Sequence, residues 1–338
     1  MAGAASVLGA RRLARVLRGA TELALLRTGL ELGLFEALRA SRTASALADH
    51  QGLAPDLVEA WVNAAYLHGL LTKTADGFVP SAFPRWLLDA PESASLHAAL
   101  DQAALSWLPR LGELPALMKG AERPAWGAAD EARRTAAVSR LLESRALAAL
   151  GRIPGVHRAR RVLDVGCGQG TYLAGFLLRH RDAHGVGIEL DPAVAEEARR
   201  TLVEAQVARR GAIRAGDFLT MALREDGFDL ALLNQSMHYF APAARAALFR
   251  RLREHLSKGG VVAIQTAVAT HEIASRLLGT AAGSADFDLF LRCHRNLYGL
   301  PDPVELARAL RDAGFAETGE VPVVPGGATR FVWGRLLS

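Results

Sequence analysis

The chain has little cysteine, and its apolar runs are short. Two cysteines among 338 residues, Cys167 and Cys293, cannot build a disulfide framework, which favours a reducing cytoplasm. No uninterrupted apolar segment approaches the roughly 20 residues needed to cross a bilayer, and none follows the N-terminal arginines as a signal peptide would require. The sequence therefore predicts a cytoplasmic protein without a membrane partner.

Lysine is also scarce, because only three of the 40 basic residues are lysine and the net charge of +5 rests on arginine. The arginines alternate with acids along predicted helices, as where Arg199-Arg200 follows Glu196-Glu197. Such mixed faces are typical of solvated helix surfaces and not of a basic stripe that tracks phosphates. We therefore expect no nucleic-acid partner.

The most informative stretch is a strand that turns over glycines into a helix. Residues 162–165 suit a buried strand and include Asp164, residues 171–178 suit a helix, and Gly166, Gly168 and Gly170 lie between them. Glycines at such a turn let a ligand lie against bare backbone at the helix N-terminus. The pattern alone is a weak signal, because glycine-rich turns occur in many folds.

Two acids further along the chain define the ligand. Glu189 ends a second predicted strand, where it is placed to bind both hydroxyls of a ribose. Asp217 and Phe218 follow a third strand and suit the amine and the ring face of adenine. Asp164 would repel a phosphate and attract an ammonium, and the loop lacks the G-x-G-x-x-G spacing of dinucleotide sites. Adenosine with an amino acid head, as in S-adenosylmethionine, fits these features.

These residues resemble the class I S-adenosylmethionine-dependent methyltransferases. Residues 228–234 are similar to the family's fourth strand, and residues 256–262 to its turn into the fifth. The resemblance implies an α/β fold with a doubly wound, mostly parallel, Rossmann-like sheet of seven strands. A glycine-rich turn in another doubly wound fold is the alternative. The predicted cofactor-binding residues are Asp164, Gly166, Gly168, Gly170, Glu189, Leu190, Asp217, Phe218 and Asn234.

The N-terminal region has a winged-helix pattern, with helices expected over 10–40, 43–48 and 55–68 and a hairpin over 69–79. Its second short helix carries Asp56 and Glu59 and no cation, which argues against DNA recognition. The order resembles small-molecule O-methyltransferases that dimerise through this region, so we expect a homodimer. The predicted domains are 1–92, winged helix; 93–154, helical bridge and substrate cap; and 155–338, cofactor binding and catalysis.

His238 follows the fourth predicted strand, where a methyl acceptor must approach. It aligns with the catalytic histidine in the His-Asp-Trp pattern of O-methyltransferases, but Tyr239 replaces the acid. His238 is therefore a general base, a histidine that only lines the pocket and positions the acceptor, or a residue with a structural role. As a base with an ordinary pKa, it would make the rate fall below about pH 6.5.

The acceptor side is the least determined part of the sequence. An inward-facing Arg295 would favour an acidic acceptor, whereas a solvent-exposed Arg295 would not. No metal-ligand spacing is present. We expect methylation of a small molecule at a hydroxyl in secondary metabolism; carbon or nitrogen methylation, a non-methylating reaction with the same cofactor, and a cofactor-sensing regulator are the alternatives. The predicted substrate-binding residues are Trp126, Met237, Tyr239, His271, Arg295 and Tyr298, and further candidates for the lining are Gln265, Thr266, Glu272, Arg292, His294 and Asn296.

Overall fold

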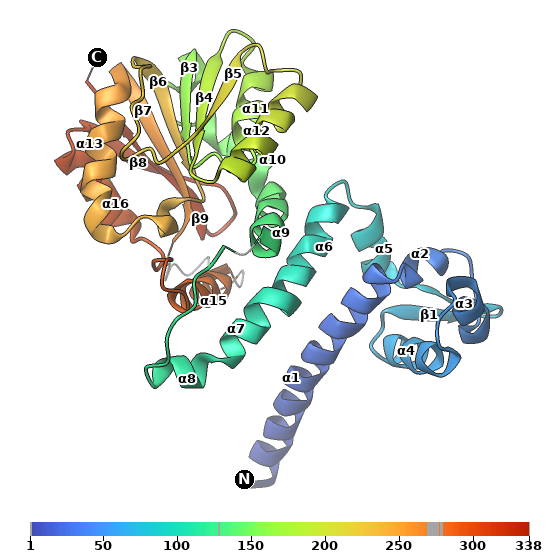
Figure 1. Ribbon diagram of the computed structural model, residues 1–338. Helices are drawn as coiled ribbons and strands as arrows, with labels where there is room; N and C mark the ends of the chain where they lie inside the picture. The colour runs from blue at the N-terminus through green and yellow to red at the C-terminus, as the bar shows by residue number, and fades with distance from the viewer. Residues whose placement is uncertain (1, 128, 269–276, 278–279, 338) are drawn as a thin grey trace. The chain divides into compact units, whose positions relative to one another are not determined.

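The computed structural model describes residues 2–127, 129–268, 277 and 280–337. The chain divides into two compact units, one of Met1–Pro109 with Arg133–Val138 and one of Arg110–Ala132 with Ser139–Ser338 (Figure 1). The division into three domains at residues 92 and 154 stays a prediction. Within the described residues, no helix combines the length and the apolar character needed to span a bilayer.

The first unit has the helix, turn, helix and hairpin order that the sequence predicts. The Thr43 hydroxyl accepts the backbone N–H of Ala46 and so begins α3, and Pro55 occupies the first turn of α4. Phe35 and Trp61 pack edge to face in the core, with ring centroids 5.4 Å apart. The elements are α1 (Ala2–Glu31), α2 (Leu34–Ala37), α3 (Ala44–Gln51), α4 (Pro55–Leu67), β1 (Leu71–Thr74), β2 (Gly77–Pro80), α5 (Ala82–Asp89), α6 (Ser93–Gln102) and a π-turn (Ala103–Trp107).

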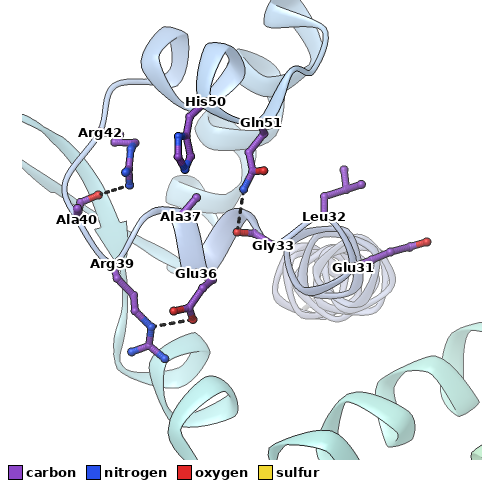
Figure 2. Close-up of a pocket in the computed structure, with 10 residues that line it drawn as sticks. All are labelled: Glu31, Leu32, Gly33, Glu36, Ala37, Arg39, Ala40, Arg42, His50 and Gln51. Carbon is purple, nitrogen blue, oxygen red and sulfur yellow. Dashed lines mark hydrogen bonds and ion pairs between the residues drawn. The ribbon is translucent and has the colours of Figure 1, made fainter.

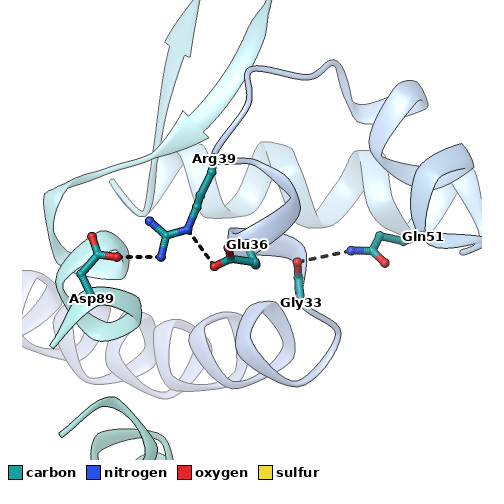
Figure 3. Close-up of polar contacts among 5 residues, drawn as sticks. All are labelled: Gly33, Glu36, Arg39, Gln51 and Asp89. Carbon is teal, nitrogen blue, oxygen red and sulfur yellow. Dashed lines mark hydrogen bonds and ion pairs between the residues drawn. The ribbon is translucent and has the colours of Figure 1, made fainter. Parts of the chain in front are cut away.

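A shallow hollow lies beside α2 (Figure 2). The Gln51 amide donates to Gly33 O at 3.3 Å and ties α3 to the turn between α1 and α2. Arg39 bridges Glu36 at 2.8 Å and Asp89 at 2.7 Å (Figure 3). Its guanidinium is thus already neutralised by two carboxylates.

The second unit contains the predicted sheet of seven strands, in the order β5-β4-β3-β6-β7-β9-β8. The first five strands are parallel, and β9 runs antiparallel to both β7 and β8. The predicted doubly wound, mostly parallel α/β architecture is therefore confirmed. The strands are β3 (Arg161–Val165), β4 (His184–Glu189), β5 (Gly211–Ala215), β6 (Phe228–Asn234), β7 (Leu256–Ala267), β8 (Glu317–Pro322) and β9 (Thr329–Arg335).

Helices cover both faces of this sheet (Figure 1). Side chains of alternate strand residues pack with α10 (Glu143–Leu150), α11 (Thr171–Arg179) and α12 (Pro192–Glu204) on one face. The intervening residues pack with α13 (Arg245–His255) and α16 (Pro303–Asp312) on the other. Burial on both faces explains why the central strands are apolar almost throughout. The remaining helices are α7 (Leu108–Gly112), α8 (Leu114–Met118), α9 (Ala129–Ser139) and α15 (Thr280–Arg292).

The predicted turn before the fifth parallel strand lies within the strand. β7 begins at Leu256, which pairs with Phe228, and the register shifts between Phe228 and Leu230. Gly259 adopts a φ of 74°, a left-handed conformation that favours glycine. The Lys258-Gly259-Gly260 segment is thus an irregularity within the strand, held by residues that follow β9: the Gly259 N–H donates to Leu337 O, and the Leu336 N–H donates to Gly260 O, both at 3.0 Å.

Candidate cofactor and acceptor site

The glycine loop connects β3 to α11 and requires glycine at three positions. Gly166, Gly168 and Gly170 have φ angles of 66°, 53° and 74°. A Cβ at Gly166 would lie 3.2 Å from Ser236 Cβ, and one at Gly170 would lie 3.1 Å from Ala198 Cβ, whereas the Cβ position of Gly168 faces open space. The loop is therefore held close to its neighbours and leaves bare backbone at its centre.

Asp164, just before this loop, is a completely buried carboxylate. Asn234 donates a hydrogen bond to its Oδ1 at 3.4 Å, and its Oδ2 has no hydrogen-bond partner among the described residues. Burial raises the pKa of Asp164 to about 7, the Asn234 hydrogen bond opposes this rise, and the charge of Glu189 adds to it. A buried carboxylate of this kind is stabilised by a cationic group, and the ammonium of an amino acid is such a group.

The carboxyl ends of β6 and β7 add further polar groups to the same face. Asn234 lies directly opposite Gln265 in the parallel register, and Gln265 is fully buried. Asn234 Oδ1 and the Ser236 hydroxyl have no hydrogen-bond partner within the described part of the chain. Polar groups that are buried without partners fit a site that a polar ligand completes. Sequence reasoning did not single out Ser236, and no local signal marks it, because its place beside Gly166 is a contact between segments that are distant in the chain.

Glu189 supports the loop from the end of β4. The backbone N–H of Gly168 donates to its Oε2 at 2.9 Å, and that of Asp191 donates to its Oε1 at 3.1 Å. The half-buried carboxylate is therefore fixed beside the glycine loop, at the strand end where the sequence predicts a ribose.

Loss of Glu189 is expected to weaken S-adenosylhomocysteine binding. Charge-assisted hydrogen bonds are the strong ones, so Glu189→Ala should cost on the order of 2–3 kcal/mol of binding free energy. Because the carboxylate also holds Gly168, Glu189→Gln serves as the conservative variant and should lose less. Calorimetry measures both affinities, and an unchanged affinity in Glu189→Ala would refute the ribose assignment.

At the predicted adenine end, the structure separates exposed residues from core residues. Asp217 is exposed, and its Oδ1 accepts the backbone N–H of Leu219 at 2.9 Å. Leu190 is 69% exposed. Phe218, however, is 3% exposed, and the Arg251 guanidinium lies 5.2 Å from its ring centroid. Phe218 therefore packs in the hydrophobic core and does not present an open ring face, contrary to the expectation.

His238 lies in the short turn Met237–Tyr239 after β6 and is 6% exposed. Its carbonyl accepts the backbone N–H of Tyr298 at 2.8 Å, and the Phe287 ring lies edge-on at 5.7 Å. Burial lowers the pKa of His238 to about 4. The imidazole is therefore neutral at physiological pH. The fall in rate that an ordinary histidine pKa predicts below about pH 6.5 is thus expected only near pH 4.

Trp126 and Tyr298 lie in segments that the structure brings together with His238. The Asn296 side chain accepts the backbone N–H of Trp126 at 2.7 Å and donates to its carbonyl at 2.9 Å. The Trp126 ring packs edge-on against His294, at 5.3 Å between ring centroids. Tyr298 binds His238 as described, and Tyr239 is 46% exposed. Tyr239, with its ring centroid 4.4 Å from that of His238, and Phe287 are the aromatic rings found next to the imidazole in the described residues.

Of the other three predicted substrate-binding residues, two lie where they do not face an acceptor, and the third is not among the described residues. Met237 is fully buried in the core with α13 and α16. The Arg295 side chain is 61% exposed and pairs with Glu122 at 3.2 Å, so it faces solvent and does not indicate an acidic acceptor. His271, like the further candidate Glu272, lies outside the described residues. Among the described residues, no group of three His, Cys, Asp or Glu side chains is placed to hold a metal ion.

Comparison with known proteins identifies the domain. Residues 162–260 match the family of methyltransferase domains. "Probable methyltransferase ltbC" of Aspergillus luteorubrus is 26% identical over 125 residues, which are 35% of this chain and 44% of that protein. The chain spans less than half the length of the curated relatives it matches.

Solved structures share the fold over nearly the whole chain. An O-methyltransferase family protein from Burkholderia thailandensis is 23% identical, covers 98% of each chain and has a TM-score of 0.79. Human N-acetylserotonin methyltransferase, solved with S-adenosylmethionine, is 16% identical, covers 98% of each chain and has a TM-score of 0.78. The resemblance predicted from the motifs is confirmed: residues 162–260 match the methyltransferase domain family, and the fold is shared over nearly the whole chain with solved S-adenosylmethionine-dependent methyltransferases.

Proposed function

We propose that the protein transfers a methyl group from S-adenosylmethionine to a hydroxyl of a small molecule, in secondary metabolism. The observation that carries the proposal is the buried carboxylate of Asp164 beside three left-handed glycines, at the strand ends where a doubly wound sheet binds ligands. The solved O-methyltransferase of similar fold supports oxygen as the acceptor atom. S-adenosylmethionine supplies an already activated methyl group when it is bound.

The chain's own residues bind the cofactor, orient the acceptor and exclude water from the site. Asp164 would hold the ammonium of the cofactor, Glu189 its ribose, and Asp217 its adenine. His238 is buried and neutral, so its imidazole accepts a hydrogen bond from the acceptor hydroxyl and directs the oxygen lone pair. Positioning of this kind can supply roughly 7–11 kcal/mol in favourable cases.

The proposal is tested by the products formed from isotopically labelled cofactor. The full chain is incubated with panels of phenols, carboxylic acids and amines, and mass spectrometry with NMR locates the label. Label on a phenolic oxygen supports the proposal. Label on carbon or nitrogen alone would replace it with the corresponding methylation, and binding without any transfer would favour a cofactor-sensing protein.

We further propose that the protein is a homodimer through its first unit. α1 carries a series of apolar side chains that are 53–65% exposed: Val7, Leu8, Leu13, Val16 and Leu17. Exposed apolar patches of this size on a helix are typical of interaction surfaces, and an obligate dimer buries roughly 2,000 Å² or more. A second copy of the chain offers a complementary surface, because its α1 exposes the same apolar residues.

Light scattering at micromolar concentration is therefore expected to give twice the monomer mass. Leu13→Glu/Leu17→Glu should give a monomer, because two charges would be buried in the interface. Val304→Glu is the matched control, since Val304 is 69% exposed on α16. A wild-type monomer, or dissociation of the control to the same extent, would contradict the proposed interface.

A further inference from the structure

A hollow of about 430 Å³ lies where the parallel strands β3 and β4 begin, at what we call the amino edge of the sheet. It is formed by the two segments that lead into β3 and β4, whose first residues Arg161 and His184 are paired. In a parallel sheet this edge is opposite the carboxyl ends, where Asp164 and Glu189 lie. The hollow is lined by His157, Arg158, Ala159, Arg160, His180, Arg181, Asp182 and Ala183.

The backbone around this hollow is fixed by two charged side chains. Asp229 Oδ2 accepts the backbone N–H groups of Arg160 and Arg161 at 2.8 and 2.9 Å. The Arg210 guanidinium donates to the carbonyls of Leu177, His180 and Ala183 at 2.8–3.0 Å. Both lining segments are thus held in place before any ligand binds. Asp229 and Arg210 are therefore already hydrogen-bonded to backbone groups of the protein.

The cations of the lining are poorly neutralised. Asp182 is the single acid, and it pairs with Arg160 at 3.6 Å while both side chains are more than 70% exposed, a weak arrangement. Arg158 donates to His157 Nε2 at 3.1 Å and not to an acid. Burial lowers the pKa of His180, and the charges of Arg179 and His157 lower it further, which indicates a positive potential at the hollow.

The hollow of the first unit provides a contrast. There Arg39 is paired with two carboxylates at normal hydrogen-bond distance (Figure 3). Within the described residues, Arg158 and Arg181 have no ion-pair partner. The amino-edge hollow therefore combines concavity, a fixed backbone and available guanidinium groups.

We propose that this hollow binds a small phosphate-bearing anion. Guanidinium groups match phosphate oxygens with paired, charge-assisted hydrogen bonds, and the arginines that line the hollow come from two separate segments of the chain. The volume lies within the range of small-molecule sites. The site stands apart from the carboxyl edge, so it does not depend on the proposed methyl transfer.

Isothermal titration of the full chain with inorganic pyrophosphate at about 50 mM salt tests the proposal. We expect saturable binding to the wild type and at least tenfold weaker binding to Arg158→Ser/Arg181→Ser. Arg250→Ser/Arg308→Ser removes the same charge from exposed positions on α13 and α16 and should bind like the wild type. S-adenosylhomocysteine affinity should be the same in all three proteins, because these arginines lie away from the glycine loop.

Three results would overturn the proposal. The first is the absence of saturable pyrophosphate binding to the wild type at millimolar concentration. The second is equal weakening in the control variant, which would indicate a non-specific effect of net charge. The third is binding of citrate as tight as that of pyrophosphate, which would assign the hollow to carboxylates.

Discussion

At pH 8, Asp164→Asn is expected to bind S-adenosylhomocysteine at least 100-fold more weakly than the wild type. Removing one partner of a buried charge pair costs about 3–5 kcal/mol, and the ligand's ammonium would otherwise be paired with Asp164. Asparagine keeps the shape of the side chain and can still accept the hydrogen bond from Asn234. The loss therefore reports the charge, and calorimetry measures it.

The same carboxylate predicts how binding depends on pH. Its pKa is raised to about 7, so below that pH the ligand must displace a proton from Asp164. Wild-type affinity should fall about tenfold for each pH unit between 7 and 5. Asp164→Asn should have a flat profile in this range. A wild-type affinity that does not vary between pH 5 and 8 would contradict the role of Asp164.

The stability of the ligand-free protein should change in the opposite direction. A carboxyl group whose pKa rises from 3.8 to about 7 on folding binds more protons when folded, so it destabilises the fold as pH increases through this window. Asp164→Asn should therefore be more stable than the wild type at pH 8, by up to about 4 kcal/mol. Thermal denaturation measures this, and Asp312→Asn, at an exposed position on α16, should show no such gain.

The parts of the fold that the sequence predicts correctly depend on local sequence. Residues 228–234 form β6 with the predicted bounds, because a buried parallel strand is a continuous apolar run. The glycine loop was found because left-handed backbone favours glycine. In both cases the determining interactions lie within a few residues of each other in the chain.

The errors concern side chains whose surroundings come from distant segments. Phe218 was assigned to an open pocket face, but Arg251 on α13 covers its ring. Arg295 was assigned to the acceptor, but Glu122, which lies more than 170 residues earlier, pairs with it at the surface. The pKa of His238 depends on burial that residues near 287 and 298 help to create. No local pattern encodes these contacts.

Replacing His238 separates the two roles that the sequence leaves open. A phenol has a pKa near 10, so full proton transfer to an imidazole with a pKa of about 4 is unfavourable by about six units. His238 should therefore act as a hydrogen-bond acceptor that orients the hydroxyl. His238→Ala is expected to lower kcat by about 100-fold, because the acceptor is misplaced. His238→Gln, which retains an accepting oxygen, should stay within about tenfold of the wild type.

The pH profile of kcat provides the independent readout. With the imidazole neutral down to about pH 4, the wild-type rate should be constant between pH 5 and 8, and His238→Gln should give the same shape. S-adenosylhomocysteine affinity should be unchanged in both variants, and His50→Gln, at an exposed position of the first unit, serves as the control. Two results together would instead make His238 a general base: a wild-type kcat that falls below about pH 6.5, and a His238→Gln variant that is inactive. That outcome would mean that the bound acceptor restores the basicity which burial removes.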